Sequence, residues 1–88
     1  MEKCLLKQVE KQQLTAKDNG FYWTHLQQLI KQIHSECAEI EEASKSGNQK
    51  HLQEELGDLI HAAVDLAIFC GFDPHETLAN SIKKFQKL

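Results

Sequence analysis

One stretch of the chain decides the fold: residues 26–70, which read LQQLIKQIHSECAEIEEASKSGNQKHLQEELGDLIHAAVDLAIFC. Apolar residues recur every three or four positions on both sides of a short polar turn at residues 44–48. This spacing predicts two amphipathic helices that pack antiparallel as a hairpin. We expect their buried faces to consist of Leu26, Leu29, Ile30, Ile33, Cys37 and Ile40 on the first helix, and of Leu52, Leu56, Leu59, Ile60, Ala63, Leu66, Ala67 and Cys70 on the second.

Turn signals before the hairpin predict another helix. Residues 2–17 carry apolar side chains at moderately helical spacing and end at the turn sequence of residues 18–20, Asp-Asn-Gly. Thr24 stands three residues before Gln27, which predicts a capping box at the start of the hairpin.

Signals after the hairpin predict a last helix over residues 74–87. Gly71 suits the left-handed position that closes a helix. Asp73, Pro74 and Glu76 then stand at the N-cap, first and third helical positions. Since no segment alternates with a period of two, the sequence predicts an all-α fold of four helices with short loops.

The length of 88 residues sets the organisation. It allows one domain over residues 1–88, in which residues 1–20 form an N-terminal helix and turn and residues 21–88 the remaining helices. A chain of this size buries too little surface to be more than marginally stable alone. We therefore expect a homodimer or homotetramer, with the helical bundle completed by oligomerisation.

Charge and composition exclude several classes of protein. Thirteen Asp and Glu residues oppose ten Lys residues, with a net charge of −3, which is unlike the basic surface of nucleic-acid-binding proteins. Apolar runs are too short to span a membrane or form a signal peptide, so we expect a cytoplasmic protein without membrane contact. The separated Cys4, Cys37 and Cys70 indicate a reducing compartment, and we expect them to be small buried or half-buried hydrophobes.

Two pairs of acidic residues carry the candidate chemistry. Glu36 and Glu39 are three residues apart, as are Glu55 and Asp58, so each pair projects from one side of its helix. In an antiparallel hairpin the pairs can face each other, and a divalent cation would relieve their repulsion. Oxygen ligands favour magnesium, manganese or calcium over zinc. The alternative is that these carboxylates are solvated.

The same residues resemble a known family. Glu36-Cys-Ala-Glu39 followed by Glu55-Leu-Gly-Asp58 resembles the ExxE…ExxD signature of MazG-like nucleotide pyrophosphohydrolases, in the all-α NTP pyrophosphatase superfamily. The stretch 54–60 resembles that family's EELGDLL helix start. The resemblance extends from residue 26 to the end of the chain.

The end of the chain both extends the resemblance and departs from it. Lys84-Phe85 with Lys87 resembles the closing KFxxR element of the family, but Lys87 stands where arginine is usual. Ser35 replaces a first glutamate before the ExxE motif, and Ile82 replaces an asparagine that the family often has. Lysine lacks the bidentate fork of arginine, so these departures concern substrate binding more than metal binding.

The resemblance implies a Mg²⁺-dependent hydrolase, with Mn²⁺ as an alternative ion, that splits an NTP or dNTP into the monophosphate and pyrophosphate. Carried over by position, Glu36, Glu39, Glu55 and Asp58 would be the metal ligands. We choose Glu39 as the carboxylate that also positions or deprotonates the attacking water. The sequence does not select it over Glu36.

Other residues are candidates for substrate binding. Trp23 can stack on a nucleobase, or can instead staple the helix start or fill a subunit interface. Lys84 and Lys87 can contact phosphate, or can simply complement a helix C-terminus. Asp65 follows Asp58 two turns on and can line the site, with a solvated or interfacial position as the alternative.

Two further functions compete with hydrolysis. The chain could be a catalytically weak or inactive helical module that binds metal or a partner, which the serine at position 35 makes credible. A ferritin-like di-iron protein is disfavoured because the Glu-x-x-His motif is absent.

Overall fold

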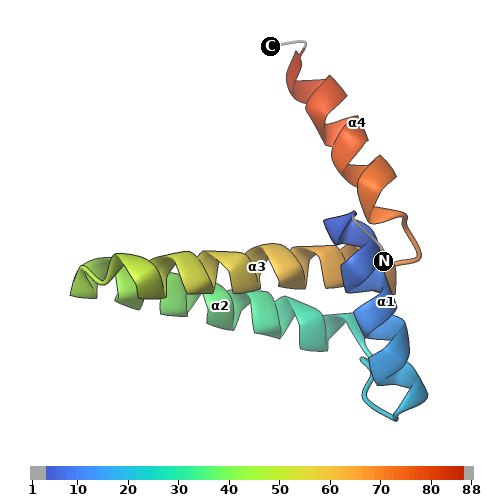
Figure 1. The fold of residues 1–88 in the computed structure, drawn as a ribbon, viewed down its shortest axis with the longest axis horizontal. Helices are drawn as coiled ribbons and strands as arrows, with labels where there is room; N and C mark the ends of the chain where they lie inside the picture. Colours follow the sequence, from blue (N-terminus) through green and yellow to red (C-terminus); the bar gives the residue numbers. More distant parts are fainter. Residues whose placement is uncertain (1–3, 87–88) are drawn as a thin grey trace.

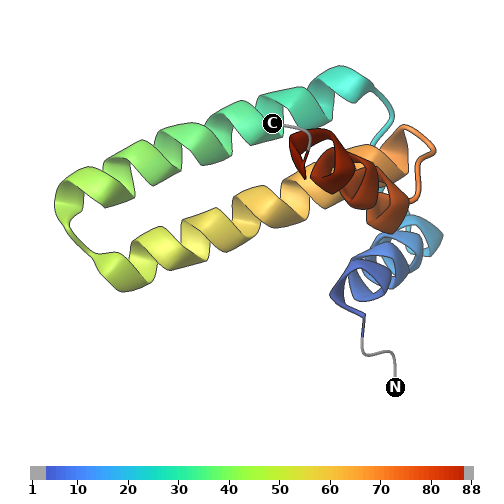
Figure 2. The ribbon, with the colours of Figure 1, turned by 90° about the horizontal axis from the view of Figure 1, so that it is seen from above.

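The computed structural model describes residues 4–86, which form four helices: α1 (Leu5–Asp18), α2 (Leu26–Ser46), α3 (Gln49–Phe69) and α4 (Pro74–Gln86). Helices α2 and α3 form a long antiparallel hairpin, α1 crosses its open end, and α4 projects away from it (Figures 1 and 2). The all-α prediction is confirmed. Over the described residues, none of the helices has the length and apolarity needed to cross a membrane. Lys87, a predicted site residue, lies outside this range.

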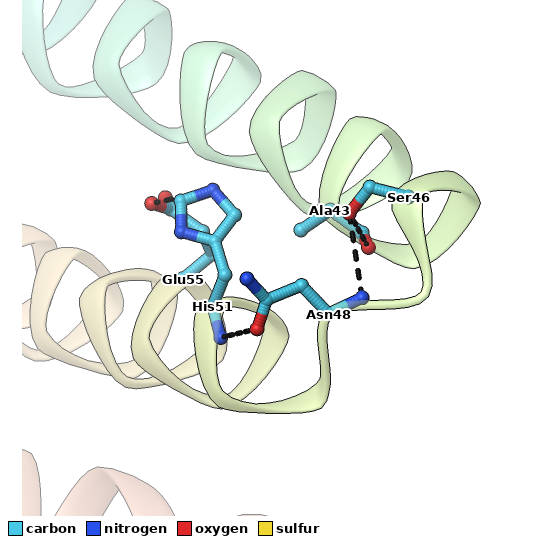
Figure 3. A network of polar contacts seen from close by, with 5 residues as sticks. All are labelled: Ala43, Ser46, Asn48, His51 and Glu55. Atoms are coloured by element: carbon cyan, nitrogen blue, oxygen red, sulfur yellow. Dashed lines mark hydrogen bonds and ion pairs between the residues drawn. The ribbon is translucent and has the colours of Figure 1, made fainter.

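The turn of the hairpin is built by local hydrogen bonds (Figure 3). Gly47 has φ 74°, a left-handed conformation in which a side chain would be strained. Asn48 caps α3, because its Oδ1 accepts a hydrogen bond of 3.1 Å from the backbone N–H of His51. Ser46 Oγ donates to the carbonyl oxygen of Ala43 at 2.8 Å. This short turn makes α2 and α3 antiparallel, as predicted.

The capping box predicted at Thr24 and Gln27 is wrong by one residue. Gln28 is the residue whose side chain reaches back, and its Oε1 accepts from the backbone N–H of Thr24 at 2.9 Å and of His25 at 3.1 Å. Helix α2 starts at Leu26, so its third position, from which a side chain can reach the N-cap, is Gln28.

The boundary between α3 and α4 follows the prediction. Gly71 has φ 86° and ends α3. Pro74 is the first residue of α4, and Asp73 Oδ1 accepts a hydrogen bond of 3.4 Å from the backbone N–H of His75.

The core of the chain is small. Among residues 4–86 the buried apolar side chains are Leu29, Ala43, Ala62 and Val64. Several residues expected in the buried faces are instead exposed: Leu26, Ile30, Cys37, Leu56, Ile60, Ala63 and Cys70. The expectation of buried cysteines is also wrong, since Cys4, Cys37 and Cys70 are all exposed. Helices α2 and α3 contact each other along one side only. The rest of the apolar surface of each helix is therefore left uncovered by the other.

Candidate metal centre

Three carboxylates meet in the middle of the hairpin. One oxygen each from Glu36 and Glu39 of α2 and Glu55 of α3 lies within 4.8 Å of the others. The i, i+3 spacing puts the two α2 residues on one side of their helix, and the short turn brings α3 back beside them. The predicted approach of these acidic residues is therefore seen for three of the four.

Two of these carboxylates are incompletely satisfied. Glu36 is only 6% exposed, and its Oε1 accepts a hydrogen bond of 2.9 Å from Nε2 of Gln32. Its Oε2, like Oε2 of Glu55, is buried and has no hydrogen-bond partner among the described residues. A buried oxygen without a partner is costly. A bound cation would satisfy both oxygens, so the residues present fit a hard divalent ion.

The neighbouring carboxylates change the pKa of Glu55. Its pKa is raised from 4.5 to about 7, mainly because hydrogen bonding with Glu39 favours the protonated carboxyl, and further because burial and the Glu39 charge disfavour ionisation. His51, whose Nε2 lies 3.8 Å from Glu55 Oε1, opposes this shift. Without a metal, Glu55 therefore keeps its proton to a higher pH than an ordinary glutamate, and a bound cation would displace that proton.

Asp58, the fourth predicted ligand, lies apart from the group of three carboxylates. It is exposed, and its charge contributes to the raised pKa of Glu55. It lines a cleft of about 370 Å³ that also contains Glu36. We call this space the acidic cleft; its lining residues are Trp23, Leu29, Gln32, Glu36, Asp58, His61, Ala62 and Asp65. A role for Asp58 as a ligand stays a prediction.

A second cleft of about 790 Å³ continues from the first. We call it the aromatic cleft; it lies between α1, the segment before α2 and the end of α3, and its lining includes Phe21, Tyr22, Trp23, Ile68 and Phe69. Trp23, His61 and Asp65 line both clefts. The predicted substrate residues Trp23 and Asp65 are thus brought beside the acidic residues. Their combined volume suits a ligand larger than a metal ion.

Asp65 is held at the junction of the two clefts. Burial raises its pKa, and His61, whose Nε2 lies 3.8 Å from Asp65 Oδ2, lowers it. Gln13 of α1 donates from Nε2 to the backbone oxygen of Asp65 at 3.3 Å. Helix α1 therefore supports this part of the site.

Of the predicted phosphate-binding lysines, Lys84 lines neither cleft. Lys84 lies on α4, which projects away from the hairpin (Figure 1), and its Nζ lies 5.9 Å from the centre of the Phe85 ring. Lys87 is outside the described residues. Contact of either with phosphate stays a prediction.

Sequence reasoning missed two residues of the site. Gln32 holds Glu36, and His61 lies between the clefts beside Asp65. Each precedes its partner by four residues on the same helix. That spacing was a usable signal, because residues four apart are neighbours on a helix surface.

Comparison with known proteins identifies the family. A family model described as "MazG nucleotide pyrophosphohydrolase domain" matches residues 24–87. The chain belongs to the MazG family. The match includes all four acidic residues of the two motifs and leaves the whole of α1 outside.

Relatives of this MazG chain are longer proteins. It is 33% identical over 73 residues to the "Nucleoside triphosphate pyrophosphohydrolase/pyrophosphatase MazG" of Thermotoga maritima, covering 83% of this chain and 28% of that protein. It is 30% identical over 84 residues to the "Nucleoside triphosphate pyrophosphohydrolase" of Escherichia coli K12, covering 93% of this chain and 32% of that protein. The chain thus spans about a third of the length of these relatives. No solved structure matches it.

Proposed function

We propose that this MazG chain is a Mg²⁺-dependent hydrolase that converts a nucleoside triphosphate and water into the nucleoside monophosphate and pyrophosphate. The observation that carries the proposal is the cluster of Glu36, Glu39 and Glu55, whose oxygens lie within 4.8 Å of one another at the side of a two-part cleft. The family match and the names of the relatives agree with this chemistry.

The carboxylates have different roles in this proposal. Glu36, Glu39, Glu55 and Asp58 would hold Mg²⁺, or Mn²⁺ in its place, which when bound neutralises phosphate charge and activates water. Glu36 is buried and held by Gln32, so it acts as a fixed ligand. Glu39 is the exposed member of the cluster, which supports its role in orienting or deprotonating the attacking water.

The nucleoside part of the substrate would lie toward the aromatic cleft. Trp23 is 36% exposed and lines both clefts, so its ring can stack on a base while the phosphates extend toward the acidic residues. Asp65, at the junction, would accept a hydrogen bond from the nucleoside. Lys84 and Lys87 remain the proposed phosphate contacts.

We further propose that the 88 residues act as one domain within a homodimer or homotetramer. Leu29 is the largest fully buried side chain of the described residues, and the other buried apolar residues are no larger than valine. A core of that size supports only marginal stability in a single chain.

The experiment is an assay of pyrophosphate release from a panel of canonical and modified nucleoside triphosphates. We expect release with Mg²⁺ that stops when EDTA is added. Glu39→Gln and Asp58→Asn should abolish it, whereas Glu41→Gln, an exposed position on the same helix, should not. Lack of release from every nucleotide by the wild-type chain, with metal bound, would favour the inactive binding module. Release that survives in both site variants would contradict the site.

A further inference from the structure

The aromatic cleft contains a carboxylate that the metal cluster does not use. The volume of this cleft, about 790 Å³, is that of a site for a small molecule. Among the described residues that line it, Asp65 is the one acidic residue. It is also not a member of the cluster of three carboxylates. Asp65 is therefore the negatively charged acceptor that a ligand in this cleft would meet.

The carboxylate of Asp65 accepts no hydrogen bond from residues 4–86. Gln13 donates to the backbone oxygen of Asp65 and leaves the carboxylate free. Nε2 of His61 lies 3.8 Å from Oδ2, which is too long for a hydrogen bond. The side chain of Asp65 is only 20% exposed, so a carboxylate without donors is costly at this position. A ligand that brings N–H groups would satisfy it.

The surroundings of Asp65 suit a nucleobase. Trp23 lines the same cleft, and an indole ring can stack on the face of any base. A base stacked there would present its edge to the polar side chains of the cleft, which include His61 and Asp65. Gln13 ties this part of α3 to α1, so Asp65 is held in place by two helices.

The common bases differ in what they offer to a carboxylate, which can only accept hydrogen bonds when ionised. Guanine presents two adjacent donors, N1–H and the N2 amino group. Adenine and cytosine present an amino group beside a ring nitrogen that is itself an acceptor, and uracil and thymine present one N–H between two carbonyl groups. Guanine alone can therefore satisfy both oxygens of Asp65, in the bidentate geometry that strengthens charged hydrogen bonds.

His61 matches the remaining group of the same edge. The O6 carbonyl of guanine is the neighbour of N1, so a base held at N1 and N2 needs a donor beside the carboxylate. His61 Nε2, at 3.8 Å from Oδ2, is beside the carboxylate without being bonded to it. An imidazole N–H can donate to a carbonyl oxygen. Adenine carries an amino group in place of O6 and would meet a donor with a donor.

We infer that the aromatic cleft selects guanine nucleotides: the base stacks on Trp23, Asp65 accepts from N1 and N2, and His61 donates to O6. The support for Asp65 comes from Gln13 in α1, which lies outside the residues that match the family model. This inference names the substrate class of the proposed function, and it rests on that proposal only where hydrolysis is measured.

Binding of nucleoside monophosphates tests the inference without catalysis. Trp23 is the single tryptophan of the chain, so quenching of its fluorescence reports on this cleft. With Mg²⁺, GMP should bind at least about tenfold more tightly than IMP, which lacks only the N2 amino group, because a hydrogen bond to a charged group is lost. Asp65→Ala should remove this difference, whereas Glu41→Gln, an exposed position, should keep it. Equal binding of GMP and IMP by the wild type, or binding of neither, would overturn the inference.

A gain of binding is the sharper test. In Asp65→Asn the amide offers one acceptor and one donor, which match N1–H and the O2 carbonyl of xanthine. This variant should bind XMP at least about tenfold more tightly than GMP, the reverse of the wild type. An unfolded chain cannot produce such a reversal. A folded Asp65→Asn chain that still prefers GMP would overturn the inference, and if the variant does not fold, the wild-type comparison of GMP with IMP decides.

Hydrolysis separates this inference from the proposed function. The kcat/KM for pyrophosphate release should be at least about tenfold higher with GTP than with ITP, and this ratio should fall to about one in Asp65→Ala. Release that shows no preference between GTP and ITP would keep the proposed function and overturn the selection of guanine. Selective binding of GMP without release from any triphosphate would refute the proposed function and keep the selection.

Discussion

Two faces of the same hairpin differ in how far one chain completes them. The acidic face brings Glu36, Glu39 and Glu55 within 4.8 Å of one another and adjoins two clefts, to which α1 and Trp23 contribute. Ile30 and Ile60 stand about 120–180° around their helices from these carboxylates, and both are exposed. One chain can therefore bring the proposed metal ligands together, but it leaves part of its apolar surface exposed.

The largest effect is expected from a substitution in the cluster of carboxylates. Glu55→Gln removes one ligand and half of the repelling pair, so pyrophosphate release should fall at least about 100-fold, since metal activation contributes several kcal/mol. The metal-free variant should nevertheless be at least as stable as the wild type, because the repulsion is gone. Kinetics and thermal unfolding in EDTA measure the two effects. A variant that loses both activity and stability would identify Glu55 as a structural residue.

A smaller effect is expected from a substitution on the exposed apolar side of the hairpin. Ile60→Asp places a charge on a residue that the proposed oligomer would cover, and loss of its apolar burial costs about 1.5–3 kcal/mol. The dissociation constant of the oligomer should rise at least about tenfold, as measured by sedimentation equilibrium. Ile60→Leu is the matched control and should preserve assembly. Equal association of both variants would place the interface elsewhere.

A substitution at Trp23, where the two clefts meet, should change substrate binding without changing metal binding. Trp23→Ala should raise KM by about 5–160-fold, because stacking on a base contributes about 1–3 kcal/mol. Trp23→Phe should retain most of the affinity, and Mn²⁺ binding should be unchanged in both. If Trp23→Ala instead lowers the oligomer mass and leaves KM unchanged, the tryptophan fills an interface.

The smallest effect is a dependence of stability on pH. The pKa of Glu55 is about 7 in the folded metal-free chain, against 4.5 ordinarily, so the folded state holds a proton that the unfolded state releases. The stability contributed by this group is present below about pH 4.5 and is lost as pH rises through about 7. Thermal unfolding in EDTA should show this decline in the wild type and a weaker one in Glu55→Gln. Identical slopes would contradict the raised pKa.

Much of this architecture was predictable from local chemistry. Gly71 and Pro74 marked the boundary of α3 and α4, and the i, i+3 spacing of Glu36 and Glu39 with a short turn was enough to predict that they face Glu55. The start of α2 was missed by one residue because Gln27 and Gln28 are chemically equal, and only the backbone decides which one reaches the N-cap.

The sequence does not show what covers the apolar side of each helix. Periodicity identified Ile30 and Ile60 as apolar positions, but it cannot tell whether the same chain or another copy buries them. For the same reason the sequence suggested that Lys84 contacts phosphate, but it did not indicate that α4 projects away from the α2–α3 hairpin. Partners that are distant along the chain, such as Gln13 and Asp65, have no local signal at all.

The most direct test of the metal centre is a count of bound Mn²⁺ by electron paramagnetic resonance at pH 8, without nucleotide. We expect at least one ion per wild-type chain, retention of that ion in Glu41→Gln, and its loss in Glu36→Gln, Glu39→Gln and Glu55→Gln. Ion binding that is equal in the wild type and all of these variants would show that the cluster is not the metal site.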